Sequence, residues 1–370
     1  MRAEGIGIAS TAAVEVPVLL AERQTTSRLA ALDTARGLAI VGMVVHHSAQ
    51  CLKSAQPAGL ADWMVSVIGG IPTGLFLLLA GIGIGFLGRT AARFGIPARA
   101  ILWPRARFLL VIGIVNMLAW PYDILRLYGL VMLLAPWMLR ASPRSLGLAG
   151  VAIVALQQVL LYLVAPSDHD WGEGTPSTEI PWLWLTGLLL DGARPLLPWA
   201  ALIFLGLGLS RLDLGSPAVR IRLLVCGALL TVLAHAVAAM AELALPQEDP
   251  LLRISWGTRD DPATPFFVLS VAGWAMVLLA LSMASWVRWP RSRLLAALGD
   301  TGRLSLTWYV AHVWFLSWLE DGLEVEVPTG WTLLIALGLS LVMIWASVRW
   351  SRRADRGPFE ALLRRTPHVR

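Results

Sequence analysis

Ten stretches of mainly apolar residues dominate the sequence, and each is close to the length of about 20 residues that a helix needs to cross a bilayer. They run roughly over 35–51, 63–87, 104–120, 124–140, 145–165, 195–210, 221–243, 265–287, 303–319 and 331–349. Only 15% of the residues are charged, whereas soluble domains carry about 25%. Because a helix satisfies its own backbone hydrogen bonds in lipid, we expect an all-α, polytopic membrane bundle of about ten spanning helices.

The basic residues fall almost entirely in alternate connections between these stretches. One set of connections, together with the two termini, holds 25 of the 30 basic residues; the other set holds four, and Arg126 lies inside the fourth stretch. Basic loops mark the cytoplasmic side of a membrane protein, so both termini are predicted to be cytoplasmic. The pI near 10.1 therefore reflects topology and contact with the lipid bilayer, and we expect no nucleic-acid partner.

The rest of the chain adds few further signals. Residues 1–28 are predicted as a disordered cytoplasmic tail, 29–350 as the membrane domain and 351–370 as a basic cytoplasmic tail. The two cysteines are far apart and the histidines show no metal-ligand spacing, so no metal site is expected. Nucleotide-binding P-loop, zinc-protease and serine-hydrolase motifs are also absent from the sequence.

The first stretch, "RGLAIVGMVVHH", places an arginine and a histidine on one face of a helix. Arg36 and His47 are eleven residues apart, which is about three turns with a remainder near 20° and a rise of about 16 Å. Asp33 lies close to the same stripe. Arg36 could simply extend to the membrane surface, and His47 could be a structural, hydrogen-bonded residue. Ionisable groups at membrane depth nevertheless mark functional sites, so this face is predicted to line a cavity.

Several motifs resemble the transmembrane acyltransferase superfamily, which includes acyltransferase family 3 and the heparan-alpha-glucosaminide N-acetyltransferase-like proteins. The stretch "LAALDTARGLAIVGMVVHH" is similar to the first membrane helix of that group, with its L-D-x-x-R-G signature and a histidine eleven residues after the arginine. The resemblance continues through "PTGLFLLLAGIGIGF", "DILRLYGLVMLLAP", "LPWAALIFLGLGLSRLDL", "GRLSLTWYVAHVWF" and "RGPFEALLRR". It covers about residues 28–365, and its first and fourth motifs are the most specific.

The resemblance implies an acyltransferase of the bacterial cytoplasmic membrane. The donor would be cytoplasmic acetyl-CoA or another acyl-CoA, and the acceptor a hydroxyl or amine of a sugar or glycan outside the cytoplasm or at the membrane. Asp33, Arg36 and His47 occupy the positions implied to be catalytic. His47 would act either as a general base or as a carrier of the acyl group.

Other residues are candidates for binding the two substrates. The CoA phosphates need a positive inner surface, and guanidinium groups suit phosphate; one short predicted inner loop supplies Arg89, Arg93, Arg105 and Arg107. Candidates for the acceptor are Asp123, Arg126, Tyr128 and His312. For Asp123 and Arg126 the alternative is a local ion pair, and for His312 it is a hydrogen bond in the core.

Two other functions fit the same residues. In a transporter or flippase, His47 and Arg36 would line the path of a proton or a solute. In a non-catalytic membrane scaffold, neither residue would be needed for chemistry. Acyl transfer is the interpretation that the resemblance favours.

Overall fold

The computed structural model describes residues 12–51, 68–164, 189, 195–245, 250–258, 263–323 and 329–365. These residues form helices joined by short connections, and the described part of the chain contains no β-strand. The all-α fold expected from the apolar stretches is confirmed. The predicted outer loop around 166–194 lies almost entirely outside the described residues.

Each of the ten predicted stretches overlaps a helix within the described residues. The helices are α1 (Ala12–Cys51), α3 (Ile71–Arg93), α4 (Ala98–Asn116), α5 (Leu125–Met138), α6 (Pro143–Val164), α8 (Leu196–Leu209), α9 (Pro217–Ala244), α10 (Pro250–Trp256), α11 (Pro265–Arg288), α12 (Arg293–Arg303), α13 (Ser305–Leu323), α14 (Thr329–Ser351) and α15 (Pro358–Arg365). The short helices α10, α12 and α15 lie in connections or in the predicted tail. Residues 12–28, predicted as a disordered tail, form the first part of α1, and α15 lies within the predicted tail 351–370.

Six helices in the described residues are long and apolar enough to cross a membrane. They are Leu29–Cys51, Ile71–Arg93, Pro143–Leu160, Pro217–Ala244, Pro265–Arg288 and Trp331–Ser351. The apolar helices α5 and α8 have 14 residues each, or about 21 Å, which is shorter than the bilayer core of about 30 Å. The chain is a helical membrane protein, and its ten-span topology remains a prediction.

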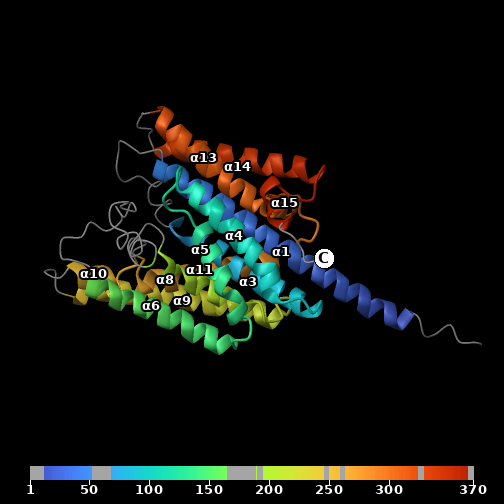
Figure 1. Cartoon of the computed structure of the whole chain (residues 1–370), viewed down its shortest axis with the longest axis horizontal. Coiled ribbons are helices and arrows are strands. Elements are labelled where there is room, and N and C mark those ends of the chain that lie inside the picture. The colour runs from blue at the N-terminus through green and yellow to red at the C-terminus, as the bar shows by residue number, and fades with distance from the viewer. Residues whose placement is uncertain are drawn as a thin grey trace, which may run out of the picture.

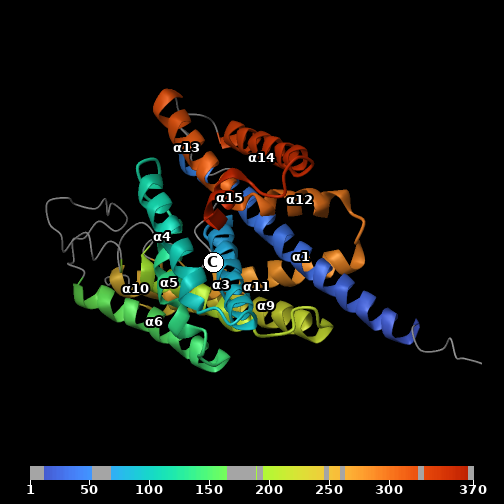
Figure 2. The ribbon, with the colours of Figure 1, turned by 45° about the vertical axis from the view of Figure 1, so that its right-hand side comes forward.

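The helices form a bundle whose centre is α3. Helix α1 packs against α3, α11, α12, α13 and α14, while α3 also packs against α8 and α11. In both views α13 and α14 lie on one side of the bundle and α6 on the other, with α3 between them (Figures 1 and 2). The motif-bearing half of α1 is therefore enclosed by other helices.

Burial separates the inner helices from the outer ones. Most of α3 and α11 is buried, whereas α9 presents large apolar side chains outward, among them Leu229, Val232 and Met240. Exposed apolar faces of this length suit contact with lipid rather than water. The outer faces of α6 and α14 have the same character.

Candidate functional site

The first site element is the acidic–basic pair of the α1 motif. Arg36 Nη1 donates to Asp33 Oδ1 at 2.6 Å, one helical turn away, and both side chains are half-buried. Thr34, between them in sequence, is fully buried; its hydroxyl donates to the Leu295 carbonyl and accepts from Trp286 Nε1 at 2.7 Å. These contacts hold this part of α1 against α11 and α12.

Two glycines allow α1 and α12 to approach closely at this level. A Cβ on Gly37 would collide with the Leu298 carbonyl, and one on Gly302 would collide with the Asp33 carbonyl. Backbone atoms cannot move aside as a flexible side chain can, so both positions require glycine. The glycine of the R-G signature is thus explained by packing.

A cavity of about 500 Å³, which we call the Arg36 cavity, opens beside this pair. It is lined from α1, α3, α4, α5, α12, α13 and α15 and the segment before α15. Five arginines face it: Arg36, Arg105, Arg303, Arg356 and Arg364. Its size lies in the range typical of small-molecule sites, about 300–1,000 Å³.

The carboxylates of the Arg36 cavity have local partners. Asp33 pairs with Arg36. Glu360 of α15 accepts hydrogen bonds from the backbone N–H groups of Leu306 and Thr307, at 2.7 and 3.1 Å, and from the Thr307 hydroxyl. This carboxylate caps the start of α13, where the helix dipole favours negative charge. The third carboxylate, Asp355, is exposed.

Positive charge therefore exceeds negative charge in the cavity, with five guanidinium groups against three carboxylates. Burial lowers the pKa of the Arg364 guanidinium, and the charge of the neighbouring Arg356 lowers it further. An anion bound near these two residues would relieve their mutual repulsion. The residues present fit a ligand that carries several phosphates.

The second site element is a buried cluster of aromatic rings farther along α1. His47 is 4% exposed and lies against His312 of α13, with ring centroids 5.2 Å apart and planes 11° from parallel. Trp120, in the segment between α4 and α5, packs against His47 at 4.8 Å. His47 thus points into the bundle rather than towards lipid.

Hydrogen bonds define the tautomers of the two histidines. His312 Nδ1 lies 2.8 Å from the Trp308 carbonyl, which can only accept, so this nitrogen carries the proton. In the neutral ring His312 Nε2 is then an acceptor, and it lies 2.9 Å from His47 Nδ1. His47 Nδ1 must donate to it. The remaining ring nitrogen of neutral His47, Nε2, therefore carries the lone pair.

Asp123 forms a buried network next to the histidines. Its carboxylate accepts hydrogen bonds from Asn116 Nδ2 at 2.8 Å, the Tyr309 hydroxyl at 3.2 Å and the backbone N–H of Arg126 at 3.0 Å. Burial raises the pKa of Asp123 to about 6, although these hydrogen bonds oppose the rise. The Tyr309 ring also contacts His312 edge-on at 5.7 Å. Asp123 is thus linked to the histidine pair through Tyr309.

Phe76 connects the Arg36 cavity to the buried cluster. Its side chain lines the cavity, and its ring stacks on Tyr309 with centroids 6.3 Å apart. None of the described residues that line the cavity is a histidine. Phe76 is thus one residue that contacts both the Arg36 cavity and the buried cluster.

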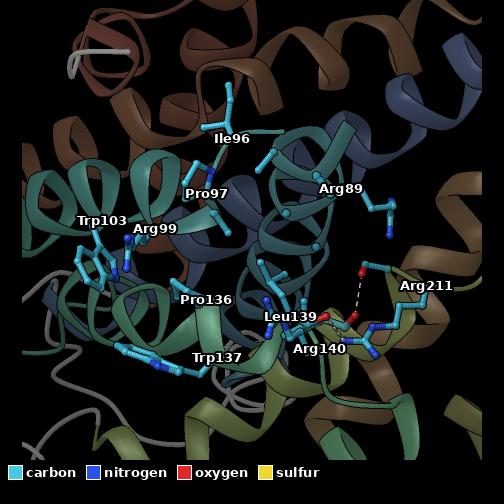
Figure 3. A pocket seen from close by; sticks show the side chains of 17 residues that line it. Arg89, Ile96, Pro97, Arg99, Trp103, Pro136, Trp137, Leu139, Arg140 and Arg211 are labelled. Atoms are coloured by element: carbon cyan, nitrogen blue, oxygen red, sulfur yellow. Dashed lines mark hydrogen bonds between the residues drawn. The ribbon is translucent and has the colours of Figure 1, made fainter. Parts of the chain in front are cut away.

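The structure separates the arginines that the sequence grouped together. Arg105 lines the Arg36 cavity, whereas Arg89 lines a second cavity of about 950 Å³ between α3, α4, α5 and α8 (Figure 3). Arg93 and Arg107 are exposed and line neither of these two cavities. A role in CoA binding for Arg89, Arg93, Arg105 and Arg107 remains a prediction.

The predicted acceptor residues also lie in different places. Asp123 and His312 belong to the buried cluster, while Tyr128 lines the Arg36 cavity. Asp123 bonds to the backbone of Arg126, and the Arg126 guanidinium reaches Met117 Sδ at 3.5 Å. The sequence left a local ion pair between Asp123 and Arg126 as the alternative. The structure instead shows backbone capping, in which the Asp123 carboxylate accepts the Arg126 N–H at the start of α5.

The prediction from the sequence assigns no role to several residues of the site. Trp120 has no periodic signal because it lies in a short connection, and Arg303, Arg356 and Arg364 come from chain segments far from the first motif. The spacing of Tyr309 and His312, three residues apart on a helix, does place both rings on one face. In the described residues no group of three or more histidine, cysteine, aspartate or glutamate side chains could hold a metal ion.

Comparison with known families identifies the family of the chain. The family described as "Heparan-alpha-glucosaminide N-acetyltransferase, catalytic" matches residues 28–246, more than half of the chain. A second family, "Protein of unknown function (DUF418)", matches residues 209–369. No curated protein matches the chain. The resemblance seen in the sequence is confirmed: the chain belongs to the heparan-alpha-glucosaminide N-acetyltransferase-like family of membrane acyltransferases.

Proposed function

We propose that the protein transfers an acetyl group from acetyl-CoA, bound in the Arg36 cavity from the cytoplasmic side, to an amine or hydroxyl group of a sugar. The observation that carries this proposal is the His47–His312 pair, in which His47 Nδ1 lies 2.9 Å from His312 Nε2, the nitrogen that would accept its proton. The lone pair on His47 Nε2 is then oriented by a second side chain, as the activation of a nucleophile by a base requires.

The Arg36 cavity supplies the recognition of the donor. Arg105, Arg356 and Arg364 would hold the phosphates of CoA, since Asp33 pairs with Arg36 and Asp300 with Arg303. Bound acetyl-CoA supplies an activated thioester. The flexible, uncharged arm that carries this thioester would extend past Phe76 towards His47, a direction that the stacking of Phe76 on Tyr309 supports.

His47 would act as the general base. Its Nε2 accepts the proton of the acceptor amine or hydroxyl while the acceptor nitrogen or oxygen forms a bond to the acetyl carbonyl carbon. His312 stabilises the resulting imidazolium because its neutral Nε2 accepts from His47 Nδ1. When the carbon–sulfur bond breaks, His47 returns the proton to the departing thiolate. The products are the acetylated acceptor and CoA thiol.

The basic ends of the helices support a cytoplasmic position for the donor cavity. Arg105, Arg303, Arg356 and Arg364 all belong to connections or termini predicted to be cytoplasmic. The buried cluster lies farther along α1, about 16 Å from Arg36 by helical rise. The acceptor would therefore reach His47 from the opposite side of the membrane or from within it.

The test uses the purified full chain in lipid nanodiscs with radiolabelled acetyl-CoA and a glycan that ends in glucosamine. We expect label to move to the glycan and free CoA to appear only when the glycan is present. His47→Ala should lose this activity by roughly 10²- to 10⁴-fold, the usual contribution of a general base. His235→Gln is the matched control, because His235 bonds to Ser270 on α11, outside both site elements.

Two results would overturn the proposal. Equal transfer by His47→Ala and by the wild type would exclude His47 as the base. Movement of the sugar across a vesicle membrane without consumption of the thioester would identify a transporter. Label retained on the protein after denaturing quench would instead identify His47 as an acyl carrier.

A further inference from the structure

A second cavity lies on the other side of α3 from the Arg36 cavity. We call it the Arg99 cavity; it has a volume of about 950 Å³ (Figure 3). On α3 it is lined by Gly85, Gly88 and Ala92, whereas Gly83, Leu87 and Thr90 line the Arg36 cavity. At about 100° per residue these two sets occupy opposite faces of the helix. The two cavities have no lining residue in common.

The Arg99 cavity is strongly positive. Arg89, Arg99, Arg140 and Arg211 line it, and none of its described lining residues is acidic. Arg211 donates to the Ala141, Met138 and Leu139 carbonyls and so caps the end of α5. Arg99 and Arg140 are exposed and form no ion pair with the residues that the structure describes. Their charges are available to a ligand.

Aromatic and apolar side chains lie next to these charges. Trp137 is 68% exposed, and its ring lies 6.2 Å from that of Trp103. Trp103 is held in place because its Nε1 donates to the Leu133 carbonyl at 3.1 Å. One turn earlier on α5, Leu134 is also exposed. Tryptophan beside arginine is typical of the headgroup level of a bilayer.

We propose that the Arg99 cavity binds the phosphate headgroup of an anionic phospholipid. Arg99 and Arg140 would contact the phosphate oxygens, and the exposed faces of Trp137 and Leu134 would contact the upper part of the acyl chains. A free phosphate would use the arginines but not this apolar rim. Basic pockets between membrane helices bind anionic headgroups by the same combination of charge and apolar contact. This site is independent of the acetyl-transfer proposal.

The proposal is tested by native mass spectrometry of the purified full chain in detergent. We would add an equimolar mixture of phosphatidylglycerol and phosphatidylcholine, and expect one phosphatidylglycerol to be retained per chain. Arg99→Gln/Arg140→Gln should weaken that binding by about tenfold or more, given the usual contribution of each arginine near a charged lipid. Arg99→Lys/Arg140→Lys should retain part of it, because the charge remains but the forked donors are lost.

Arg220→Gln/Arg222→Gln is the matched control, because it removes the same charge from the start of α9, outside the cavity. It should bind phosphatidylglycerol as the wild type does. Excess inorganic phosphate and excess CoA are added as competitors, and neither should displace the lipid. Equal retention of both lipids, or unchanged binding by the glutamine variant, would overturn the proposal. Displacement by CoA would also overturn it and would assign the cavity to the acyl donor.

Discussion

The two ends of the functional face of α1 differ in chemistry although they belong to one helix. Around Arg36 the side chains are charged and half-buried, and a cavity of about 500 Å³ opens beside them. Around His47 the rings are packed together, the histidine is 4% exposed, and the hydrogen bonds from His47 to His312 and from His312 to the Trp308 carbonyl join polar groups inside the bundle. One end suits a soluble anion, and the other suits a proton transfer away from water.

Under the proposed function, this difference would let a single helix serve both the binding of the donor and the transfer of the proton. Electrostatic attraction of a phosphate works well at a surface open to water, where guanidinium groups remain charged at little cost. A base works best where its orientation is fixed and where competing water is excluded. Three turns of α1 separate these two environments, and the helix holds Arg36 and His47 on one face at a fixed distance.

After the loss of His47 itself, the largest effect should come from its partner His312. Replacing His312 with leucine removes the acceptor that holds His47 Nδ1–H, so the rate constant kcat for acetyl transfer should fall by roughly 10- to 100-fold, less than the roughly 10²- to 10⁴-fold expected when the general base itself is removed. His312→Gln should recover most of the activity, because its amide oxygen can accept the same hydrogen bond. Steady-state kinetics that showed equal losses in the two variants would assign His312 a role in packing alone.

An intermediate effect is expected at the other end of the helix face. Arg105→Gln/Arg356→Gln should raise the KM for acetyl-CoA by about tenfold, which corresponds to about 1.4 kcal/mol, and should leave kcat nearly unchanged. S-acetyl-pantetheine, which lacks the nucleotide phosphates, is the control substrate and should be used equally by both proteins. A fall in kcat with an unchanged KM would contradict the distinction between donor binding at the Arg36 end of α1 and proton transfer at the His47 end.

The smallest effect concerns the pH dependence of stability at Asp123. Because burial raises its folded pKa from 3.8 to about 6, the stability that it contributes is full below about pH 3.8 and is lost as the pH rises through about 6. The Tm of the wild type, measured relative to that of Asp123→Asn, should therefore fall between pH 4 and pH 8.

The matched control for this measurement is Asp213→Asn, because Asp213 lies in an exposed turn and, among the described residues, its side chain accepts a hydrogen bond only from the nearby Gly215 N–H. Thermal unfolding in detergent would follow both variants across the same pH range. A Tm difference at Asp123 that stays constant across the range would show that its environment does not favour the neutral carboxyl group.

Much of the architecture follows from the sequence because membrane helices can be predicted from the length and apolarity of a stretch of residues. All ten predicted stretches overlap helices. Six helices in the described residues are long and apolar enough to cross a membrane, while α5 and α8 are too short to cross alone. A hydropathy pattern gives the position of a helix along the chain. It does not show whether that helix is long enough to cross the bilayer in the folded protein.

The site was predictable where its residues share one helix. Arg36 and His47 are fixed relative to each other by helical geometry, but of the two only Arg36 lines a described cavity. His47 is buried among aromatic rings, so the prediction that this face lines a cavity holds only at the Arg36 end. Arg89 and Arg105 are close in sequence, yet they line cavities on opposite faces of α3. Residues on different helices are brought together by packing, which is why the contribution of Arg356 and Arg364 to the Arg36 cavity has no local sequence signal.

The tautomer of His47 is the most direct test of the account. Protein labelled with ¹⁵N-histidine would be studied by solid-state NMR in lipid at neutral pH, and the His47 signals would be assigned by comparison with His47→Asn. We predict that Nδ1 carries a proton, shared in a hydrogen bond with His312, and that Nε2 carries none. A proton on Nε2, or on both nitrogens, would contradict the assignment of His47 as the base.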